Sequence, residues 1–272
     1  MKRAAGGQAL LNLGCGTRTH PDWTNVDFSV YTRLRRHAGL ARLLHEVGII
    51  SSQRWERLQA LDADVVSWDL RRGIPFEDAT FDVVFHSHLL EHLAREAAPA
   101  FLKECLRVLT PGGLLRVVVP DLERLAASYL HALARLDCGD SRAWADYDRV
   151  VDQIFEQMVR REGVGTAQQR SAVRVTERLI RGGATRIGEL HRWMYDRHAL
   201  GRLLDETGFV EFTTHRHDSS GIVAWARYGL DCDSNGSPVK PESLYVEARK
   251  PASALGSIVT GPWSPVPRGW PG

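Results

Sequence analysis

The sequence lacks several features that mark specialised classes of protein. Its 272 residues include four cysteines, Cys15, Cys105, Cys138 and Cys232, and no two of them are spaced as C-x-x-C. This spacing argues against a zinc ribbon and against a dithiol redox pair. We interpret the cysteines as free thiols, the usual state in a reducing cytosol. The first residues also lack the apolar run of a secretory signal, so we expect a cytoplasmic protein.

Long apolar runs and a strong charge of one sign are missing as well. No stretch approaches the ~20 apolar residues that a membrane-spanning helix needs. The formal net charge is +2. A charge this small gives no electrostatic reason to expect nucleic acid or a membrane as partner. One basic cluster stands out, formed by Arg33, Arg35, Arg36 and Arg42. It is either a solvated helix face or a surface that attracts an anionic molecule, such as a phosphorylated or uronic sugar.

Strand-like and helix-like patterns alternate through the first half of the chain. Five short apolar runs predict strands, at residues 10–13, 25–27, 64–68, 81–87 and 114–119. Runs such as Val117-Val118-Val119 are typical of parallel strands that are buried on both faces. Between the last two strands, an apolar stripe from Phe101 to Leu109 predicts a helix, which Thr110-Pro111-Gly112-Gly113 ends.

The second half of the chain changes character. Residues 122–190 are rich in charge and have a helical pattern, and residues 31–61 form a shorter insertion of the same kind. Asp196 is the predicted N-cap of a helix at 197–207, and strands follow at 209–215 and 244–249. The order of elements predicts an α/β fold with helical insertions.

A glycine pair follows the first predicted strand. Gly14 and Gly16 come directly after Leu13, and an acid, Asp27, ends the second strand. This is the outline of a nucleotide-binding turn, but Thr19 stands where the dinucleotide fingerprint has its third glycine. The connection from Gly14 to Thr24 is also too short for a full helix beneath a pyrophosphate. The pattern therefore favours a ligand without phosphates.

Two acids at strand ends are candidate ligand contacts. The Asp27 carboxylate can accept from both hydroxyls of a ribose, or it caps a turn. Asp69 can accept from an adenine amino group, with Leu70 against the ring, or it is an ordinary turn acid.

Five motifs in register carry a resemblance to a known family. They are Leu11-Asn12-Leu13-Gly14-Cys15-Gly16, Asn25-Val26-Asp27, the segment from Ile74 to Val84, His86-Ser87-His88-Leu89-Leu90-Glu91-His92-Leu93, and the segment from Arg107 to Gly113. Together they resemble class I S-adenosylmethionine-dependent methyltransferases. The segments Gly188–Asp196 and Ser243–Ala248 are similar to one bacterial branch of that family, whose members often occur near sugar-modifying functions.

The resemblance implies a doubly wound, Rossmann-like sheet of seven strands with an antiparallel last strand. From the pattern along the chain we expect one domain at residues 1–250, with the insertions at 31–61 and 122–190 as a helical lid, and a loose tail, rich in Pro, Gly and Ser, at 251–272. The resemblance implies S-adenosylmethionine as cofactor, bound by Asn12, Gly14, Cys15, Gly16, Asp27, Phe28, Ser29, Asp69, Leu70, His86 and Ser87. Many members carry an acid at the position of Asn12, whose amide can still order the loop backbone.

Three residues are candidates for catalysis on a small-molecule or sugar-type acceptor. His88 and His191 are candidate general bases, since histidine titrates near neutral pH. Asp121 follows the fifth strand and either positions the acceptor or caps the next helix. Each histidine also has a purely structural alternative, and we expect Glu91-His92 to start a helix. H-E-x-x-H is absent, so we predict no metal.

Two other functions fit parts of the pattern. One is a protein that binds S-adenosylmethionine without methylating, as a cyclase or regulator does. The other is a dehydrogenase, which should carry a complete glycine fingerprint and bind NAD. The short first connection argues against the dehydrogenase.

Overall fold

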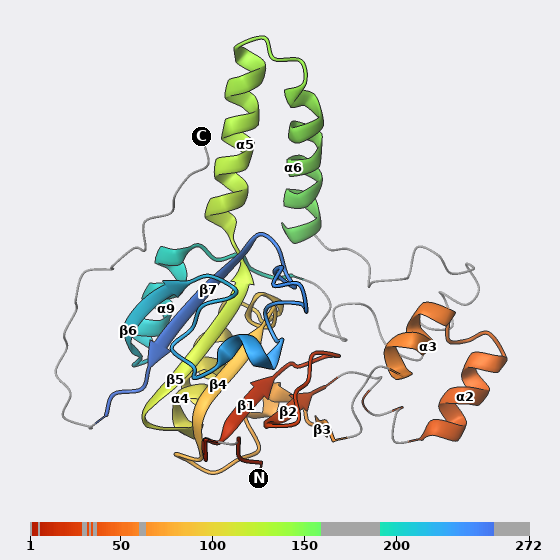
Figure 1. Ribbon diagram of the computed structural model, residues 1–272, viewed down its shortest axis with the longest axis vertical. Coiled ribbons are helices and arrows are strands. Elements are labelled where there is room, and N and C mark those ends of the chain that lie inside the picture. The colour runs from red at the N-terminus through yellow and green to blue at the C-terminus, as the bar shows by residue number, and fades with distance from the viewer. Residues whose placement is uncertain are drawn as a thin grey trace.

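The computed structural model describes residues 2–4, 6–28, 32, 34, 37–59, 64–158 and 191–252. A seven-stranded sheet forms its centre, with strand order β3-β2-β1-β4-β5-β7-β6 (Figure 1). The strands are β1 (Leu10–Leu13), β2 (Trp23–Asp27), β3 (Val66–Ser67), β4 (Phe81–Ser87), β5 (Leu109–Pro120), β6 (Val210–His215) and β7 (Ser243–Arg249). The predicted α/β fold with an antiparallel last strand is confirmed.

One strand of the sheet, β7, runs opposite to the other six. β1 to β5 are parallel, with Leu13 of β1 paired to Val26 of β2 and to His86 of β4. β7 lies antiparallel between β5 and β6. The chain moves outward from β1 to β3 and then returns to β4 on the other side of β1. The region beyond the carboxyl ends of β1 and β4, called the crevice below, lies at this reversal of strand order, where open α/β sheets bind ligands.

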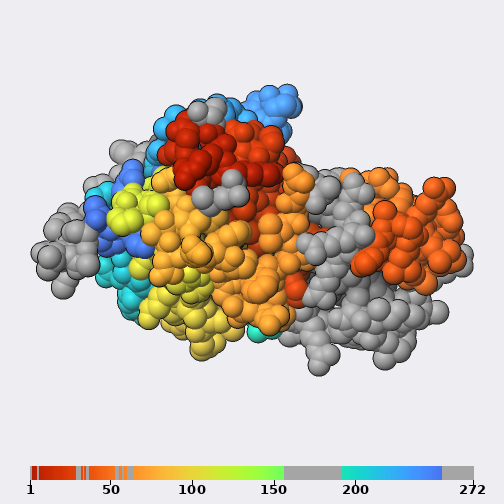
Figure 2. Space-filling view, turned by 90° about the horizontal axis from the view of Figure 1, so that it is seen from below, coloured from red at the N-terminus to blue at the C-terminus, as the bar shows by residue number. Residues whose placement is uncertain are grey.

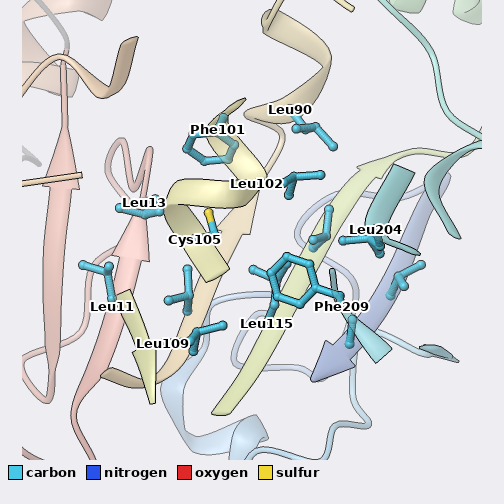
Figure 3. Close-up of a cluster of buried hydrophobic side chains, with 14 of the residues drawn as sticks. Leu11, Leu13, Leu90, Phe101, Leu102, Cys105, Leu109, Leu115, Leu204 and Phe209 are labelled. Atoms are coloured by element: carbon cyan, nitrogen blue, oxygen red, sulfur yellow. The ribbon is translucent and has the colours of Figure 1, made fainter. Parts of the chain in front are cut away.

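One face of the sheet is covered by two amphipathic helices, α4 (Ala98–Val108) and α9 (Arg197–Glu206). Pro99 lies in the first turn of α4, a position that needs no amide donor. As predicted, Asp196 caps α9, because its carboxylate accepts from the amides of His198 and Ala199. Figure 3 shows Phe101, Leu102 and Cys105 of α4 above Leu11, Leu13, Leu109 and Leu115 of the strands.

A long connection between β6 and β7 covers the other face. Its 3-10 turn η3 (Trp225–Tyr228) packs on Trp23 and Phe85 in a second apolar cluster. The fully buried Arg116 of β5 fastens this connection: Nε donates to Asp231 at 2.8 Å and Nη1 to Glu247 at 2.7 Å. Its guanidinium carbon also lies 4.6 Å from the centre of the Trp225 ring.

The two predicted insertions are helical where the structure describes them. α5 (Leu122–Asp137) and α6 (Ala143–Met158) form a hairpin that extends beyond the carboxyl end of β5 (Figure 1). α2 (Ala38–Glu46) and α3 (Ser52–Gln59) lie to the side of the β3 edge, and Figure 2 shows them projecting from the body. Residues 159–190 and the tail from 253 onward lie outside the described residues.

Several predicted boundaries were wrong. The third strand has two residues, because its pairing with β2 extends only over Val66 and Ser67. The fifth strand begins at Leu109, because Leu109 pairs with Phe81 before a bulge in the register. Thr110–Gly113 therefore belongs to β5, although the helix before it does end at Val108. Glu91-His92 lies in the 3-10 turn η2 (Leu90–His92), and the helix follows at Ala98.

Candidate functional site

The loops after β1 and β4 meet at the crevice. Gly14 follows β1 with φ +65°, a backbone conformation that side chains disfavour. A Cβ at Gly14 would lie 3.1 Å from a methyl group of Leu89, in the loop after β4. Glycine at this position therefore allows both the turn and the close approach of the two loops.

The glycine loop folds back onto β2. The amides of Gly14 and Cys15 donate to the carbonyl of Val26, at 2.8 and 3.2 Å. The Gly16 amide donates to Oδ2 of Asp27 at 2.9 Å. A Cβ at Gly16 would meet nothing within 4 Å, so the space in front of this glycine is open. The carboxylate and the glycine loop thus form one surface, which fits a ribose whose hydroxyls donate to Asp27.

Asn12 orders the loop from beneath. Its buried side-chain amide donates to the carbonyl of Arg18 at 2.8 Å and to Oδ1 of Asn25 at 3.0 Å. Asn25 in turn donates to the carbonyls of His20 and Trp23. The expectation that an amide at Asn12 can hold the loop backbone is confirmed by these bonds. An acid would have no proton to donate to either acceptor.

Asp69, which follows β3, forms its hydrogen bonds within its own turn. Asp69 caps the 3-10 turn η1 (Leu70–Arg72), and its carboxylate accepts from the amide, Nε and Nη2 of Arg71. The hydrogen bond from the Arg71 side chain lowers the pKa of Asp69. The guanidinium of Arg71 also lies 5.8 Å from the centre of the Phe28 ring. These contacts gather three predicted ligand-side residues, Phe28, Asp69 and Leu70, around one arginine, while Ser29 lies outside the described residues.

The end of β4 places two histidines in different environments. His86 is fully buried, and its ring packs edge-on against Phe101 with centroids 5.3 Å apart. Burial lowers the pKa of His86 to about 4, so the ring is neutral near pH 7. His86 can therefore contribute its backbone to the crevice, as can Ser87 beside it. His88 turns away from the strand with φ +51°.

Glu91 is the centre of a histidine cluster. His88 Nδ1 lies 3.0 Å from Glu91 Oε1, and His191 Nε2 lies 4.0 Å from the same oxygen. The rings of His92 and His191 meet at 4.7 Å between centroids. The fully buried Glu91 is desolvated, which favours its neutral form, but His88 and His92 outweigh this effect and lower its pKa. The other ring nitrogen of His88, Nε2, lies 2.9 Å from Ser243 Oγ.

The end of β5 joins the helical insertion to this cluster. Asp121 is buried and caps α5, since Oδ1 accepts from the amide of Arg124 at 3.2 Å. The Leu122 amide donates to the carbonyl of Tyr195 at 3.0 Å, and the Arg192 amide donates to the carbonyl of Glu91 at 2.7 Å. The start of the insertion at Leu122 and the chain that follows the insertion at Arg192 are thus anchored at the same edge of the sheet.

The sequence did not indicate three residues of this site. We expected Glu91 to lie at the start of a helix, and Tyr195 and Ser243 entered only as members of the segments Gly188–Asp196 and Ser243–Ala248. Tyr195 is 2% exposed, and burial raises its pKa to about 12. Their proximity depends on strands far apart in the sequence. The one available signal was the density of histidines around Glu91.

Part of the chain is similar to a known protein family. Residues 11–117 match the model described as "Methyltransferase domain". Over this stretch, which is less than half of the chain, the sequence is similar to methyltransferase domains. The match covers β1 to most of β5 and includes the glycine loop, Asp27, Asp69 and the loop after β4. The five motifs that carry the family resemblance also lie within it.

Individual relatives are similar over different lengths. A "Probable S-adenosylmethionine-dependent methyltransferase" of Mycolicibacterium smegmatis is 42% identical over 57 residues, which are 20% of this chain and 21% of the relative. The chain thus aligns with about a fifth of the curated relative that it matches. A solved Thermotoga maritima structure, named as an S-adenosylmethionine-dependent methyltransferase and possible histamine N-methyltransferase, is 14% identical, with coverage of 89% and 82% and TM-score 0.40. The solved DhpI–SAH complex is 15% identical, with coverage of 90% and 78% and TM-score 0.43.

The four cysteines are free thiols in the structure, and Cys138 alone of them is exposed. No helix among the described residues is both long and apolar enough to cross a membrane. Of the basic cluster, Arg42 is described, and its Nε lies 2.9 Å from Glu46 on an exposed helix face. Arg33, Arg35 and Arg36 lie outside the described residues.

Proposed function

We propose that the chain is an S-adenosylmethionine-dependent methyltransferase that acts on a small-molecule or sugar-type acceptor. The observation that carries the proposal is the Gly16–Asp27 hydrogen bond at the carboxyl edge, within residues 11–117. It joins the glycine loop and a ribose-type carboxylate at the point where strand order reverses. The short connection without a helix suits a nucleoside better than a pyrophosphate.

We assign the proposed cofactor-binding residues to different parts of the cofactor according to their position along the edge of the sheet. Asp27 accepts from the ribose hydroxyls, and Asp69, Leu70 and Phe28 line the adenine end. The backbone of Gly14, Cys15 and Gly16, held by Asn12, approaches the amino-acid end. His86 and Ser87 contribute the end of β4. Ser29 completes the proposed set.

S-adenosylmethionine supplies a methyl group on a sulfonium, and transfer is an in-line displacement with a neutral thioether as leaving group. The chain has to align the acceptor, exclude water and receive a proton. Alignment can contribute ~7–11 kcal/mol of the barrier reduction, and a general base adds ~10²–10⁴-fold in rate. His88, His191 and Asp121 are the proposed catalytic residues, since all three lie at the edge beside the crevice.

The structure suggests how the histidines differ. Both ring nitrogens of His88 have close polar neighbours, Glu91 and Ser243. A carboxylate on Nδ1 fixes the tautomer of an imidazole and raises its basicity. His191 directly follows the insertion at 122–190, which we propose as the acceptor lid. Of the two histidines, it is therefore the one that we expect to lie nearer to the acceptor. Replacing both His88 and His191 by Asn should reduce turnover. Full turnover by this double variant would show that neither histidine acts as the general base.

We further propose one domain at residues 1–250, with a tail at 251–272 and the insertions as an acceptor lid. Support comes from the hydrogen bonds of Leu122, the first residue of the insertion at 122–190, and of Arg192, just after it, at the carboxyl edge. A hairpin fixed at that edge can shield the transfer from water. The acceptor would then be chosen by the lid rather than by the sheet.

Calorimetric titration with S-adenosylhomocysteine, and with NAD as a control, tests the function directly. We expect 1:1 binding of the first compound and none of the second. Binding of NAD, or of neither compound, would contradict the proposal. Where S-adenosylhomocysteine binds, transfer of labelled methyl groups to a panel of sugars and small hydroxylated or amine acceptors separates a methyltransferase from a protein that binds the cofactor without consuming it.

A further inference from the structure

The Glu91 cluster has the composition of a metal site. Ligand atoms of Glu91, His92 and His191 all lie within 4.8 Å of one another. Glu91 is fully buried, and the His191 side chain is 6% exposed. Two imidazoles and one carboxylate are a ligand set that zinc enzymes and iron(II) oxygenases use. The sequence predicted no metal because His191 is about a hundred residues from Glu91 and His92.

The surroundings of the Glu91 carboxylate favour a cation. Among the described residues, the ion pairs of Glu91 are with His88 and His191, and no lysine or arginine joins them. Apart from His88 Nδ1, at 3.0 Å from Oε1, no donor in the described part of the chain lies in hydrogen-bonding geometry with either carboxylate oxygen. A buried carboxylate is costly unless it is paired or coordinates a metal. Imidazoles are good ligands for transition-metal ions, so the histidines around Glu91 can share an ion with it.

We propose that Glu91, His92 and His191 bind a divalent transition-metal ion of the zinc, iron or manganese class. Carboxylate and imidazole ligands lie about 2.0–2.2 Å from such an ion, which places the ligand atoms roughly 3.3 Å apart. The observed spread of up to 4.8 Å closes to this value through side-chain rotation. Three protein ligands leave a coordination position open, as in catalytic rather than structural sites.

The neighbouring residues hold the ligands in place. His88 contacts Glu91 Oε1 and is itself held by Ser243, an arrangement that orients a carboxylate ligand. The amides of Arg192 and Trp193 donate to the carbonyl of Glu91, at 2.7 and 3.3 Å. These two bonds fix the segment that carries His191 against the loop that carries Glu91 and His92. The site is therefore built from two distant segments by backbone contacts.

The role of the ion, unlike the site itself, rests on the proposed function. An acceptor hydroxyl that binds at the open position releases its proton more readily. With His191 bound to the ion as a ligand, His88 is the remaining candidate base for that proton. An oxygen lone pair then forms the bond to the methyl carbon while the carbon–sulfur bond breaks, and its electron pair stays on sulfur as the thioether. This assigns O-methylation of a hydroxyl-bearing acceptor to the enzyme.

The test uses the full-length protein after treatment with a chelator, titrated with Co²⁺ and followed by visible absorption. We expect 1:1 uptake with ligand-field bands, and displacement of Co²⁺ by Zn²⁺. His92→Gln and His191→Gln should each weaken Co²⁺ binding by more than tenfold, and His88→Asn by 10- to 100-fold. His198→Gln, an exposed histidine on α9, is the matched control and should bind as the unaltered protein does.

Titration of every variant with S-adenosylhomocysteine separates this proposal from the previous one. Retained binding shows that the variant is folded and that the cofactor site is intact. No 1:1 uptake of Co²⁺, or uptake that His92→Gln and His191→Gln leave unchanged, would overturn the metal site even where S-adenosylhomocysteine binds. Co²⁺ uptake that requires both histidines supports the site even where S-adenosylhomocysteine does not bind.

Discussion

The Gly16 amide donates a hydrogen bond of 2.9 Å to Oδ2 of Asp27. One residue belongs to the loop after β1 and the other ends β2, so this bond joins two neighbouring strands at their carboxyl ends. Asp27 is 8% exposed, and the space in front of Gly16 is open. A single carboxylate thus organises the loop at the edge where we propose that the cofactor binds.

Replacing Asp27 by Asn should weaken binding of S-adenosylhomocysteine by roughly 10- to 150-fold, since hydrogen bonds to a charged group contribute about 1.5–3 kcal/mol. Asn retains one oxygen for the Gly16 amide, so the loop should stay folded. Calorimetry measures the change. Asp22→Asn, which alters an exposed pair with Arg227, is the control and should leave affinity unchanged.

Alanine at the two loop glycines should have different consequences. Both have positive φ, but a Cβ at Gly14 also crowds Leu89 at 3.1 Å, whereas a Cβ at Gly16 meets no atom within 4 Å. Gly16→Ala should cost about 1 kcal/mol of stability through backbone strain, and Gly14→Ala about 1–3 kcal/mol more. Urea denaturation of Gly14→Ala with and without Leu89→Ala isolates the crowding. Equal stability of the two single variants would contradict this explanation.

Substitutions of Asp121 distinguish its two predicted roles. Asn is as good an N-cap as Asp, whereas Ala costs about 1 kcal/mol. Thermal unfolding should therefore show a loss for Asp121→Ala and little change for Asp121→Asn. A fall in turnover in Asp121→Asn, at unchanged stability, would assign the carboxylate to the acceptor. Unchanged turnover would leave Asp121 with the capping role that the Arg124 amide shows.

Acid should destabilise the fold through Glu247. Burial alone would raise the pKa of Glu247, but His215, Arg116, Ser220 and the Gly221 amide outweigh it and lower the pKa from 4.5 to about 2. The charged form is stabilised in the folded state, so its contribution is complete above about pH 4.5 and disappears as pH falls toward 2. The loss should be roughly 3 kcal/mol in the free energy of unfolding.

Urea denaturation between pH 7 and pH 2 measures this contribution. Glu247→Gln should be less stable at pH 7 and show a shallower decline in acid. Glu211→Gln, on the exposed surface of β6, should follow the unaltered protein. If Glu247→Gln has the same acid decline as the unaltered protein, other groups are responsible for it.

Arg116→Met should cost about 3–5 kcal/mol, because it leaves the carboxylates of Asp231 and Glu247 buried without their cation. The triple variant with Asp231→Asn and Glu247→Gln should recover much of this loss, since no charge then lacks a partner. Chemical denaturation compares the two. A triple variant as unstable as Arg116→Met would show that the contacts of Arg116 with Trp225 and the β6–β7 connection dominate instead.

The sequence by itself determined the order of the elements, the glycine loop and the acid of β2. These depend on local periodicity and on residues such as Gly14 and Asp196, whose backbone or capping preferences act within a few positions. The alternation of apolar runs and amphipathic helices is also local, so the α/β fold followed from it. The pairing of β3 with β2 alone and the extension of β5 to Leu109 are tertiary matters, and there the predicted boundaries failed.

Tertiary structure alone decided the Glu91 cluster. His191 reaches Glu91 because the next residue, Arg192, donates its backbone amide to the carbonyl of Glu91 at the edge of the sheet. Ser243 reaches His88 because β7 lies antiparallel beside β5. Local preferences act over a few residues, whereas a site of this kind forms where packing brings distant strand ends together and removes water from the charges between them.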